Sequence, residues 1–167
     1  MILIAYDGSA DATAAIADAG KVLAGHPAVV LTIWEPLSEL MARTPAGFGL
    51  MAGMSNPDDV DDATRRAAER VAEEGAELAR RAGLDASARA RPANGTVADS
   101  ILEQADRANA TAIVMGSRGR TGLRSRLLGS VSQSVVQRAD RAVFVAPSPV
   151  VAEVRRERLR PGRGSEA

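Results

Sequence analysis

The segment Thr111–Ser132, TAIVMGSRGRTGLRSRLLGSVS, constrains the fold of this chain more than any other part of it. An apolar run ends at Gly116, Gly119 follows three residues later, and Gly129-Ser130 opens a new segment of apolar periodicity. This order predicts a buried strand, a loop whose glycines allow sharp bends or close approach to a ligand, and a helix. The free backbone amides at the start of such a helix favour an anion such as phosphate.

Strands and helices are predicted to alternate along residues 1–148. Five short apolar runs predict strands, and the third is so poor in apolar residues that it is expected at a sheet edge. The strands are expected at Ile2–Tyr6, Val29–Trp34, Asp85–Arg91, Ala112–Met115 and Ala142–Ala146, and the helices at Ala12–Leu23, Asp58–Ala82, Val97–Ala108 and Ser130–Ala139. This alternation predicts right-handed βαβ units, and therefore a doubly wound parallel sheet with helices on both faces.

Two segments fall outside this alternation. Residues 37–57 are rich in Gly, Met and Pro without a clear period, which predicts a long loop of the mobile or functional kind. Residues 149–167 hold several arginines beside Pro and Gly, which predicts a tail with at most a short amphipathic turn. We therefore expect one domain over residues 1–148 and an Arg-rich C-terminal tail over residues 149–167.

The composition excludes several classes of protein. Zero cysteines remove disulfides, thiol catalysis and Cys-ligated metals. Basic and acidic side chains balance at 21 each, which argues against a nucleic-acid binder. No run approaches the roughly 20 apolar residues that cross a bilayer, and the first residues show no signal-type pattern. We expect a cytoplasmic protein that binds neither nucleic acid nor a membrane.

Two loops that follow strands carry residues suited to ligand binding. One is the turn Asp7–Ser9, and the other is the glycine loop, residues 116–132. In an open parallel sheet, ligands bind at the carboxyl ends of the strands, where the strand order reverses. If the order is 3-2-1-4-5, Asp7 faces the glycine loop across a crevice, and Ile33 supplies an apolar wall for a base. A simple role for Asp7 in a helix-capping turn is the alternative.

The glycine loop matches neither of two common nucleotide motifs. Lys21 is the only lysine, so a Gly-Lys-Ser/Thr phosphate loop is absent. The dinucleotide fingerprint has a different glycine spacing and follows the first strand. Gly116-x-x-Gly119, nine residues and Gly129-Ser130 instead resemble the phosphate and ribose motif of the universal stress protein family. The opening ILIAYDGS, the loop end LLGSVS and the last strand AVFV are also similar to that family, so the resemblance covers residues 1–148.

This resemblance implies both a fold and a ligand. The fold would be a Rossmann-like open five-stranded parallel sheet of order 3-2-1-4-5, as in the adenine nucleotide alpha hydrolases. The ligand would be ATP or AMP, with Mg²⁺ held by the phosphates. The base would lie near Ile33 and Met115, and the ribose or the metal-bound phosphates beside Asp7. The implied site residues are Ala5, Tyr6, Asp7, Ile33, Met115, Gly116, Arg118, Gly119, Gly129, Ser130, Val131 and Ser132.

The chemistry of the loop agrees with a phosphate ligand. Its glycines admit close backbone approach, and the hydroxyls of Ser130 and Ser132 add donors. Four arginines bring positive charge that suits a polyphosphate, although exposed arginines are also ordinary in loops. They are Arg118, Arg120, Arg124 and Arg126.

Three functions remain open on these residues. The resemblance implies a nucleotide-binding regulator of stress adaptation, and the intact glycine loop favours it. The crevice offers Asp7 and serines but no His, Cys or Lys as base or nucleophile, which argues against catalysis. Any ATP hydrolysis would then be slow and incidental. A weak ATPase, and an interaction module with a dispensable nucleotide site, are the alternatives. The resemblance also implies a homodimer through the last strand, residues 141–146, because an exposed apolar edge invites pairing.

Overall fold

Five parallel strands form one sheet in the order β3-β2-β1-β4-β5 in the computed structural model, which describes residues 1–37, 39, 57–119, 128–147 and 149–158. The strands are β1 (Ile2–Ala5), β2 (Pro27–Trp34), β3 (Asp85–Pro92), β4 (Ala112–Gly116) and β5 (Ala142–Ala146). The predicted strand order is confirmed. The apolar-poor strand β3 lies at one edge of the sheet and β5 at the other, so the central β1 has a neighbour on each side.

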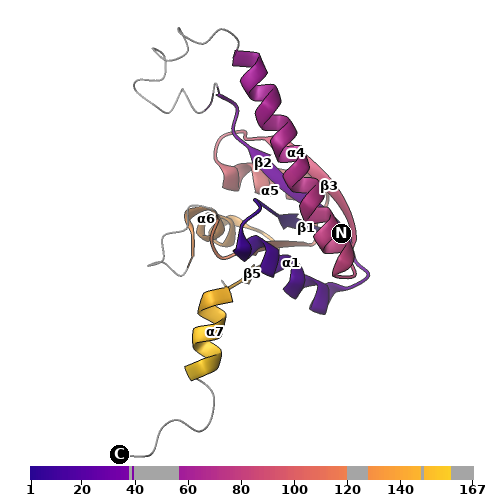
Figure 1. Cartoon of the computed structure of the whole chain (residues 1–167), viewed down its shortest axis with the longest axis vertical. Helices are drawn as coiled ribbons and strands as arrows, with labels where there is room; N and C mark the ends of the chain where they lie inside the picture. The colour runs from indigo at the N-terminus through magenta and orange to yellow at the C-terminus, as the bar shows by residue number, and fades with distance from the viewer. Residues whose placement is uncertain (38, 40–56, 120–127, 148, 159–167) are drawn as a thin grey trace, which may run out of the picture.

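Helices cover both faces of the sheet (Figure 1). Helices α1 (Ala10–Leu23) and α4 (Pro57–Arg81) pack on one face, and α5 (Val97–Arg107) and α6 (Ser130–Arg138) pack on the other. Each of these helices follows a strand and returns the chain for the next parallel strand. The amino ends of the helices therefore lie at the carboxyl ends of the strands.

Alternate residues of β1 belong to two separate cores. Ile2 and Ile4 pack with α1 and α4, whereas Leu3 packs with α5. This follows from the two-residue period of a strand. Alanines fill much of the space between helices and sheet, and Ala76 and Ala105 are 0% exposed. With aromatic residues at only 2%, the core depends on this close approach of the helices.

The C-terminal segment forms a helix, α7 (Pro149–Arg158), where the sequence predicted at most a short turn. Proline is favoured at the first helical position, because the amide that it lacks would be unpaired there. No further Gly or Pro interrupts the segment before Pro161. Helix α7 projects away from the sheet beyond β5 (Figure 1). Most of the loop expected over residues 37–57, and residues 159–167, lie outside the described residues.

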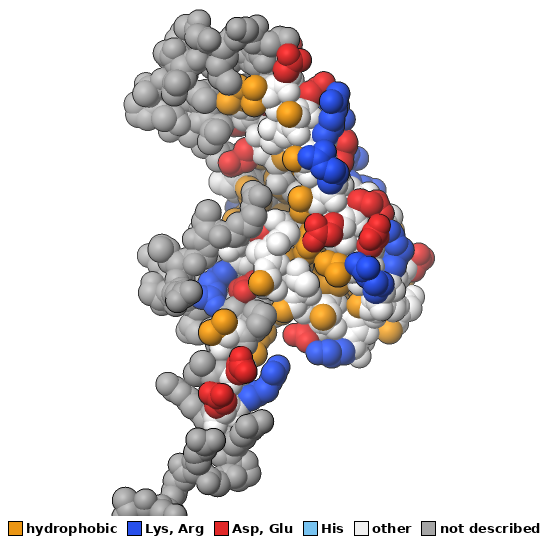
Figure 2. Space-filling view, viewed as in Figure 1, with side chains coloured by type: hydrophobic (Ala, Val, Ile, Leu, Met, Phe, Trp, Pro, Cys, Tyr) orange, Lys and Arg blue, Asp and Glu red, His pale blue; other side chains and the backbone are white. Residues whose placement is uncertain are grey.

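The outer surface of α4 is charged. Basic and acidic side chains intermingle along it (Figure 2). For example, Arg65 forms ion pairs with Asp62 and Glu69 at 3.0 Å each. Exposed pairs of this kind contribute little to stability and mark a solvated face. Within the part of the chain that the structure describes, no helix is both long and apolar enough to cross a membrane.

Candidate functional site

A cavity of about 790 Å³ opens at the carboxyl ends of the central strands. Strand β1 ends at Ala5, which lies opposite Leu31 and Met115. Its neighbours continue further, β2 to Trp34 and β4 to Gly116. Because the central strand is shorter than both neighbours, a crevice remains between them. This is the point of strand-order reversal at which open α/β sheets bind ligands.

Every residue that the resemblance placed at the site lines this cavity. They are Ala5, Tyr6, Asp7, Ile33, Met115, Gly116, Arg118, Gly119, Gly129, Ser130, Val131 and Ser132. Their contacts with a ligand stay a prediction. The expected arginines Arg120, Arg124 and Arg126 lie outside the described residues.

A second set of lining residues was not singled out from the sequence. It comes from the end of β2, the chain just after it, and helices α4 and α5. Its members include Thr32, Trp34, Leu37, Val60, Thr64, Ala67, Val71, Val97 and Ile101. In the sequence these residues occupy ordinary strand and helix-core positions. The amide of Leu37 donates to Oδ1 of Asp61 at 2.6 Å, which joins the chain after β2 to the first turns of α4. The cavity is therefore closed on this side by a helix that sequence motifs do not reveal.

The two glycines of the Gly-x-x-Gly motif lie against different parts of the molecule. A Cβ at Gly116 would lie 2.6 Å from the carbonyl carbon of Asp11 and 2.7 Å from the amide nitrogen of Ala12. A Cβ at Gly119 would lie 2.8 Å from Oδ2 of Asp7. The first turn of α1 is therefore packed directly against the start of the glycine loop. The Asp7 carboxylate lies beside the loop, as the strand order requires.

Helix α6 begins at the cavity with its first amides uncapped by a side chain. Its N-cap is Gly129, and the Gly129 carbonyl accepts from the amide of Gln133 at 2.9 Å. The amides of Ser130–Ser132 precede that bond and have no carbonyl of the helix as partner. Helices α1 and α5 differ, because the side chains of Ser9 and Thr96 cap them. The start of α6 can therefore hold an anion.

The hydroxyl of Ser132 holds the two ends of the glycine loop together. Ser132 is 2% exposed, and its Oγ donates toward the carbonyls of Ser117 at 2.8 Å and Gly129 at 3.0 Å. The amide of Gly129 also donates to the Ser117 carbonyl at 2.8 Å. The sequence predicted this hydroxyl as a second donor to the phosphates. In the structure, its proton is directed to the two carbonyls at the ends of the loop. The exposed Ser130 keeps its hydroxyl available on this side.

Arg118 is turned toward α1. Its Nε lies 3.5 Å from Oδ2 of Asp11, and the two side chains are 13% and 12% exposed. The same carboxylate oxygen accepts from the Ser117 hydroxyl at 3.0 Å. The charge that the sequence assigned to the loop at Arg118 is thus balanced by Asp11. The pair fastens the loop to the first turn of α1.

Tyr6 lines the cavity and is anchored to α4. Its side chain is 3% exposed, and its hydroxyl donates to Oε1 of Glu74 on α4 at 3.0 Å. Burial raises the pKa of the phenol, and the adjacent Glu74 carboxylate raises it further, although a hydrogen bond with Thr13 acts in the opposite direction. The phenol therefore stays protonated at neutral pH and is unsuited to act as a base.

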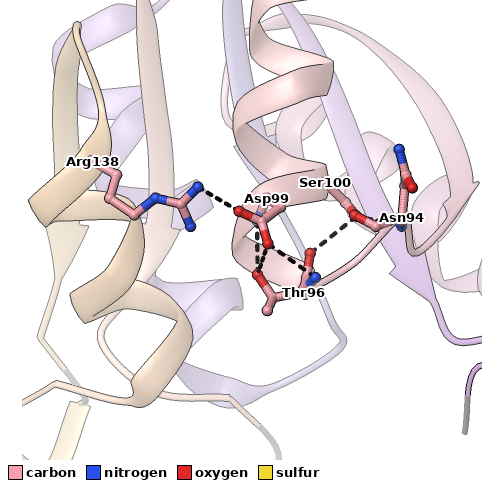
Figure 3. Close-up of polar contacts among 5 residues, drawn as sticks. All are labelled: Asn94, Thr96, Asp99, Ser100 and Arg138. Carbon is pink, nitrogen blue, oxygen red and sulfur yellow. Dashed lines mark hydrogen bonds and ion pairs between the residues drawn. The ribbon is translucent and has the colours of Figure 1, made fainter. Parts of the chain in front are cut away.

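A polar network joins α5 to α6 (Figure 3). The Thr96 hydroxyl accepts from the Asp99 amide at 3.1 Å, and the Asp99 carboxylate accepts from the Thr96 amide at 3.1 Å. Arg138 reaches from α6 to the other carboxylate oxygen of Asp99 at 2.5 Å. The Thr96 hydroxyl, together with Arg138, lowers the pKa of Asp99 to about 2. Since Val97 and Ile101 line the cavity, this network holds the α5 wall against the helix that begins at the glycine loop.

The sheet order and the position of the cavity define a Rossmann-like α/β protein with a crevice at the topological switch point. The model of the Universal stress protein family matches residues 1–147, and the chain belongs to this family. It is 32% identical to the universal stress protein YxiE of Bacillus subtilis over 137 aligned residues. The alignment covers 81% of this chain and 90% of that protein. The family resemblance read from the glycine loop is therefore confirmed.

Solved structures of the family share this fold. A universal stress protein in complex with cAMP is similar with a TM-score of 0.58 and 26% identity, over 88% of this chain and 96% of that chain. The universal stress protein UspA of Lactobacillus plantarum is similar with a TM-score of 0.63 and 19% identity, over 87% of this chain and 95% of that chain. The likeness extends over nearly the whole sheet and its helices.

Proposed function

We propose that this protein binds an adenine nucleotide, ATP or AMP, in the crevice and acts as a cytoplasmic regulator of stress adaptation. One observation carries the proposal: a single cavity joins the uncapped start of α6, residues 130–132, to the end of β2 at Ile33. The start of α6 suits phosphate, and the end of β2 suits a flat base with polar edges. The cAMP complex of a related universal stress protein supports the same ligand class.

The end of β2 offers a donor and an acceptor from one residue. In a parallel strand, the amide and carbonyl of a residue point to the same side, and successive residues point to opposite sides. The Leu31 carbonyl accepts from the Tyr6 amide at 2.9 Å on the β1 side, and the Trp34 carbonyl accepts from the Ala93 amide at 2.7 Å on the β3 side. Ile33 therefore directs its amide and carbonyl past the end of β1, into the cavity. Adenine carries the matching acceptor, N1, next to a donor, the 6-amino group.

The opposite end of the cavity suits the phosphates. The amides of Ser130–Ser132 and the exposed Ser130 hydroxyl supply donors, and the dipole of α6 favours negative charge there. Between the two ends, Met115 and Ile33 provide apolar surface for the base. Among the described residues, no three His, Asp or Glu side chains are grouped to hold a metal ion. We therefore assign Mg²⁺, where it accompanies ATP, chiefly to the phosphates.

We further propose that the nucleotide is bound without efficient turnover. Hydrolysis requires a positioned base, or a residue that orients the attacking water. His26 is the only histidine, and it precedes β2 at the end of the sheet opposite the cavity. Nucleotide occupancy would then act by shifting the shape or the partner affinity of the protein.

Isothermal titration with AMP, ATP and adenosine tests this proposal. Ser130→Pro removes one amide from the first turn of α6 but keeps the helix, because proline suits this position and Gly129 already has an extended ψ of 164°. Ser130→Ala is the matched control, which removes only the hydroxyl. We expect Ser130→Pro to weaken AMP binding more than the control does, and to leave adenosine binding unchanged. A wild-type protein that binds none of the three ligands refutes the proposal.

The open edge of the sheet supports a second proposal, a homodimer through β5. Phe144 of this edge strand is 43% exposed, and an edge strand presents unpaired backbone groups to a second copy. We expect Phe144→Glu to shift a dimer to monomers in sedimentation velocity. The control Val22→Glu, at a residue of α1 that is 69% exposed, is expected to leave the dimer intact. A wild-type protein that sediments as a monomer at micromolar concentration contradicts this proposal.

The domain boundary near residue 148 also remains our proposal. Helix α7 follows β5, so residues 149–158 leave the domain beside the proposed dimer edge. Deleting residues 149–167 is expected to leave AMP binding unchanged, because residues 149–158 do not line the cavity. A truncated protein that loses AMP affinity while it remains folded would show that the segment belongs to the domain.

A further inference from the structure

We propose that Thr32 is a positioning residue that keeps the backbone amide of Ile33 available to the base. This inference rests on the proposed nucleotide site. The registered pairing of β1 with β2 ends at Ala5 opposite Leu31, and the Tyr6 amide adds a bond to the Leu31 carbonyl at 2.9 Å. The next bond of a continued parallel ladder would run from the Ile33 amide to the Tyr6 carbonyl. That bond would turn the amide away from a ligand.

The Tyr6 carbonyl has a different partner. It accepts the hydroxyl of Thr32 at 2.9 Å, within the buried interior of the protein. Tyr6 is 3% exposed and Thr32 is 6% exposed, so this carbonyl lies where an unpaired acceptor is costly. The side-chain hydroxyl therefore replaces the backbone amide as the donor. The ladder can end at this point without an unsatisfied carbonyl.

The geometry of β1 beyond this point agrees with an early end of the ladder. After Tyr6 the chain turns at Asp7-Gly8, where Gly8 has a φ of +80°. The chain thus leaves the sheet while β2 continues beside β3 to Trp34 opposite Pro92. Ile33 is left with β3 on one side and the cavity on the other. The backbone of Thr32 points toward β3, whereas its hydroxyl donates to the Tyr6 carbonyl.

The chemical consequence concerns which base is accepted. A free amide at Ile33 donates to an acceptor on the base, and the adjacent carbonyl accepts from a donor. Adenine offers N1 and the 6-amino group in this order. Hypoxanthine carries a hydrogen on N1 and an oxygen at position 6, so both contacts are mismatched. Thr32 would therefore contribute to a preference for AMP over IMP without touching either base.

Amide hydrogen exchange in the ligand-free protein tests the positioning role directly. Thr32→Val keeps the shape of the side chain but removes the hydroxyl, and Thr32→Ser retains the donor as the matched control. We expect the Ile33 amide to exchange fast in the wild type and in Thr32→Ser. In Thr32→Val it should slow by about tenfold or more, because it then donates to the Tyr6 carbonyl. An Ile33 amide that is as protected in the wild type as that of Leu31 overturns the inference.

Calorimetry with AMP, IMP and ribose 5-phosphate tests the consequence for the ligand. Thr32→Val should weaken AMP by about tenfold, the worth of one hydrogen bond, and leave ribose 5-phosphate unchanged. The ratio of AMP to IMP affinity should fall, which a general loss of packing would not cause. If wild type and Thr32→Val bind AMP equally, the inference fails while the nucleotide site stands. If the wild type binds neither nucleotide, the proposed function fails first.

A measurement on the wild type alone covers the case in which Thr32→Val does not fold. The amide resonance of Ile33 is followed while AMP or ribose 5-phosphate is added. We expect it to shift with AMP and to stay in place with ribose 5-phosphate. A resonance that AMP does not move overturns the inference.

Discussion

The two glycines of the Gly-x-x-Gly motif should respond to the same substitution in opposite ways. In Gly116→Ala, the added methyl group meets backbone atoms of Asp11 and Ala12 at 2.6 and 2.7 Å. Those atoms belong to the first turn of α1 and can move only with the helix. In Gly119→Ala, the methyl group meets Oδ2 of Asp7 at 2.8 Å, at the end of a side chain that can shift more easily than backbone. The first substitution should therefore cost stability, and the second should affect binding.

The sizes of both effects follow from these contacts. Overpacking in a rigid environment costs about 1–3 kcal/mol, and we expect Gly116→Ala at the upper end because only backbone can yield. Gly119 has no positive φ to strain an alanine, so the free energy of unfolding should change by less than about 1 kcal/mol. Displacing Asp7 by Gly119→Ala should weaken AMP by roughly fivefold, equivalent to about 1 kcal/mol.

Urea unfolding and calorimetry with AMP, carried out on both variants, separate the two outcomes. Gly116→Ala should lower the urea midpoint, whereas Gly119→Ala should keep the midpoint and lose AMP affinity. The reasoning is refuted if Gly116→Ala is as stable as the wild type, because α1 would then not be packed against the loop. It is equally refuted if Gly119→Ala unfolds at clearly lower urea, because Asp7 could then not yield.

Two further predictions concern the helices around the cavity. The Thr96 hydroxyl is the main cause that lowers the pKa of Asp99 from its ordinary value of 3.8 to about 2. As the pH falls, Asp99 is therefore protonated first in the unfolded chain. The contribution of the Asp99 carboxylate to the free energy of unfolding is present above about pH 4 and is lost as the pH falls toward 2. Urea midpoints between pH 5 and 2 should fall more steeply in the wild type than in Asp99→Asn, and parallel curves would contradict this. Asp61→Ala should lower the free energy of unfolding by about 1.5–3 kcal/mol, because the Leu37 amide loses a charged acceptor at 2.6 Å. Asp62→Ala removes the same charge from the same helix end as a control, and equal effects of the two variants would exclude a specific role of the Leu37 bond.

Most of the fold could be predicted from the sequence, because local signals agree with the final packing. The apolar run from Ile2 and the strand before Gly116 are short and buried, as parallel strands in an α/β sheet are. The poor apolar content of residues 85–91 correctly indicates an edge strand. Helix α7 could not be predicted with the same ease, because its sequence lacks a clear apolar face and its start depends on Pro149 at the first helical position.

The candidate site was predictable only in part. The glycine loop and Asp7 were visible as motifs, since their residue types are required by backbone approach and by turns. The orientations of Arg118 and Ser132 were not visible, because they depend on the tertiary partners Asp11 and Ser117. The role inferred for Thr32 was hidden for the same reason. It follows from the residue at which one ladder ends, and a single strand sequence does not contain that information.

The cavity itself results from unequal lengths of neighbouring elements. Strand β1 has 4 residues and β2 has 8, so β2 extends past the end of the central strand. Helix α4 has 25 residues, about 37 Å at 1.5 Å per residue, whereas β2 spans about 26 Å. The excess length of α4 places Val60 and Thr64 over the crevice. Substitutions in these first turns of α4 would reshape the base end of the cavity without touching the glycine loop, so the two ends of the site can vary independently.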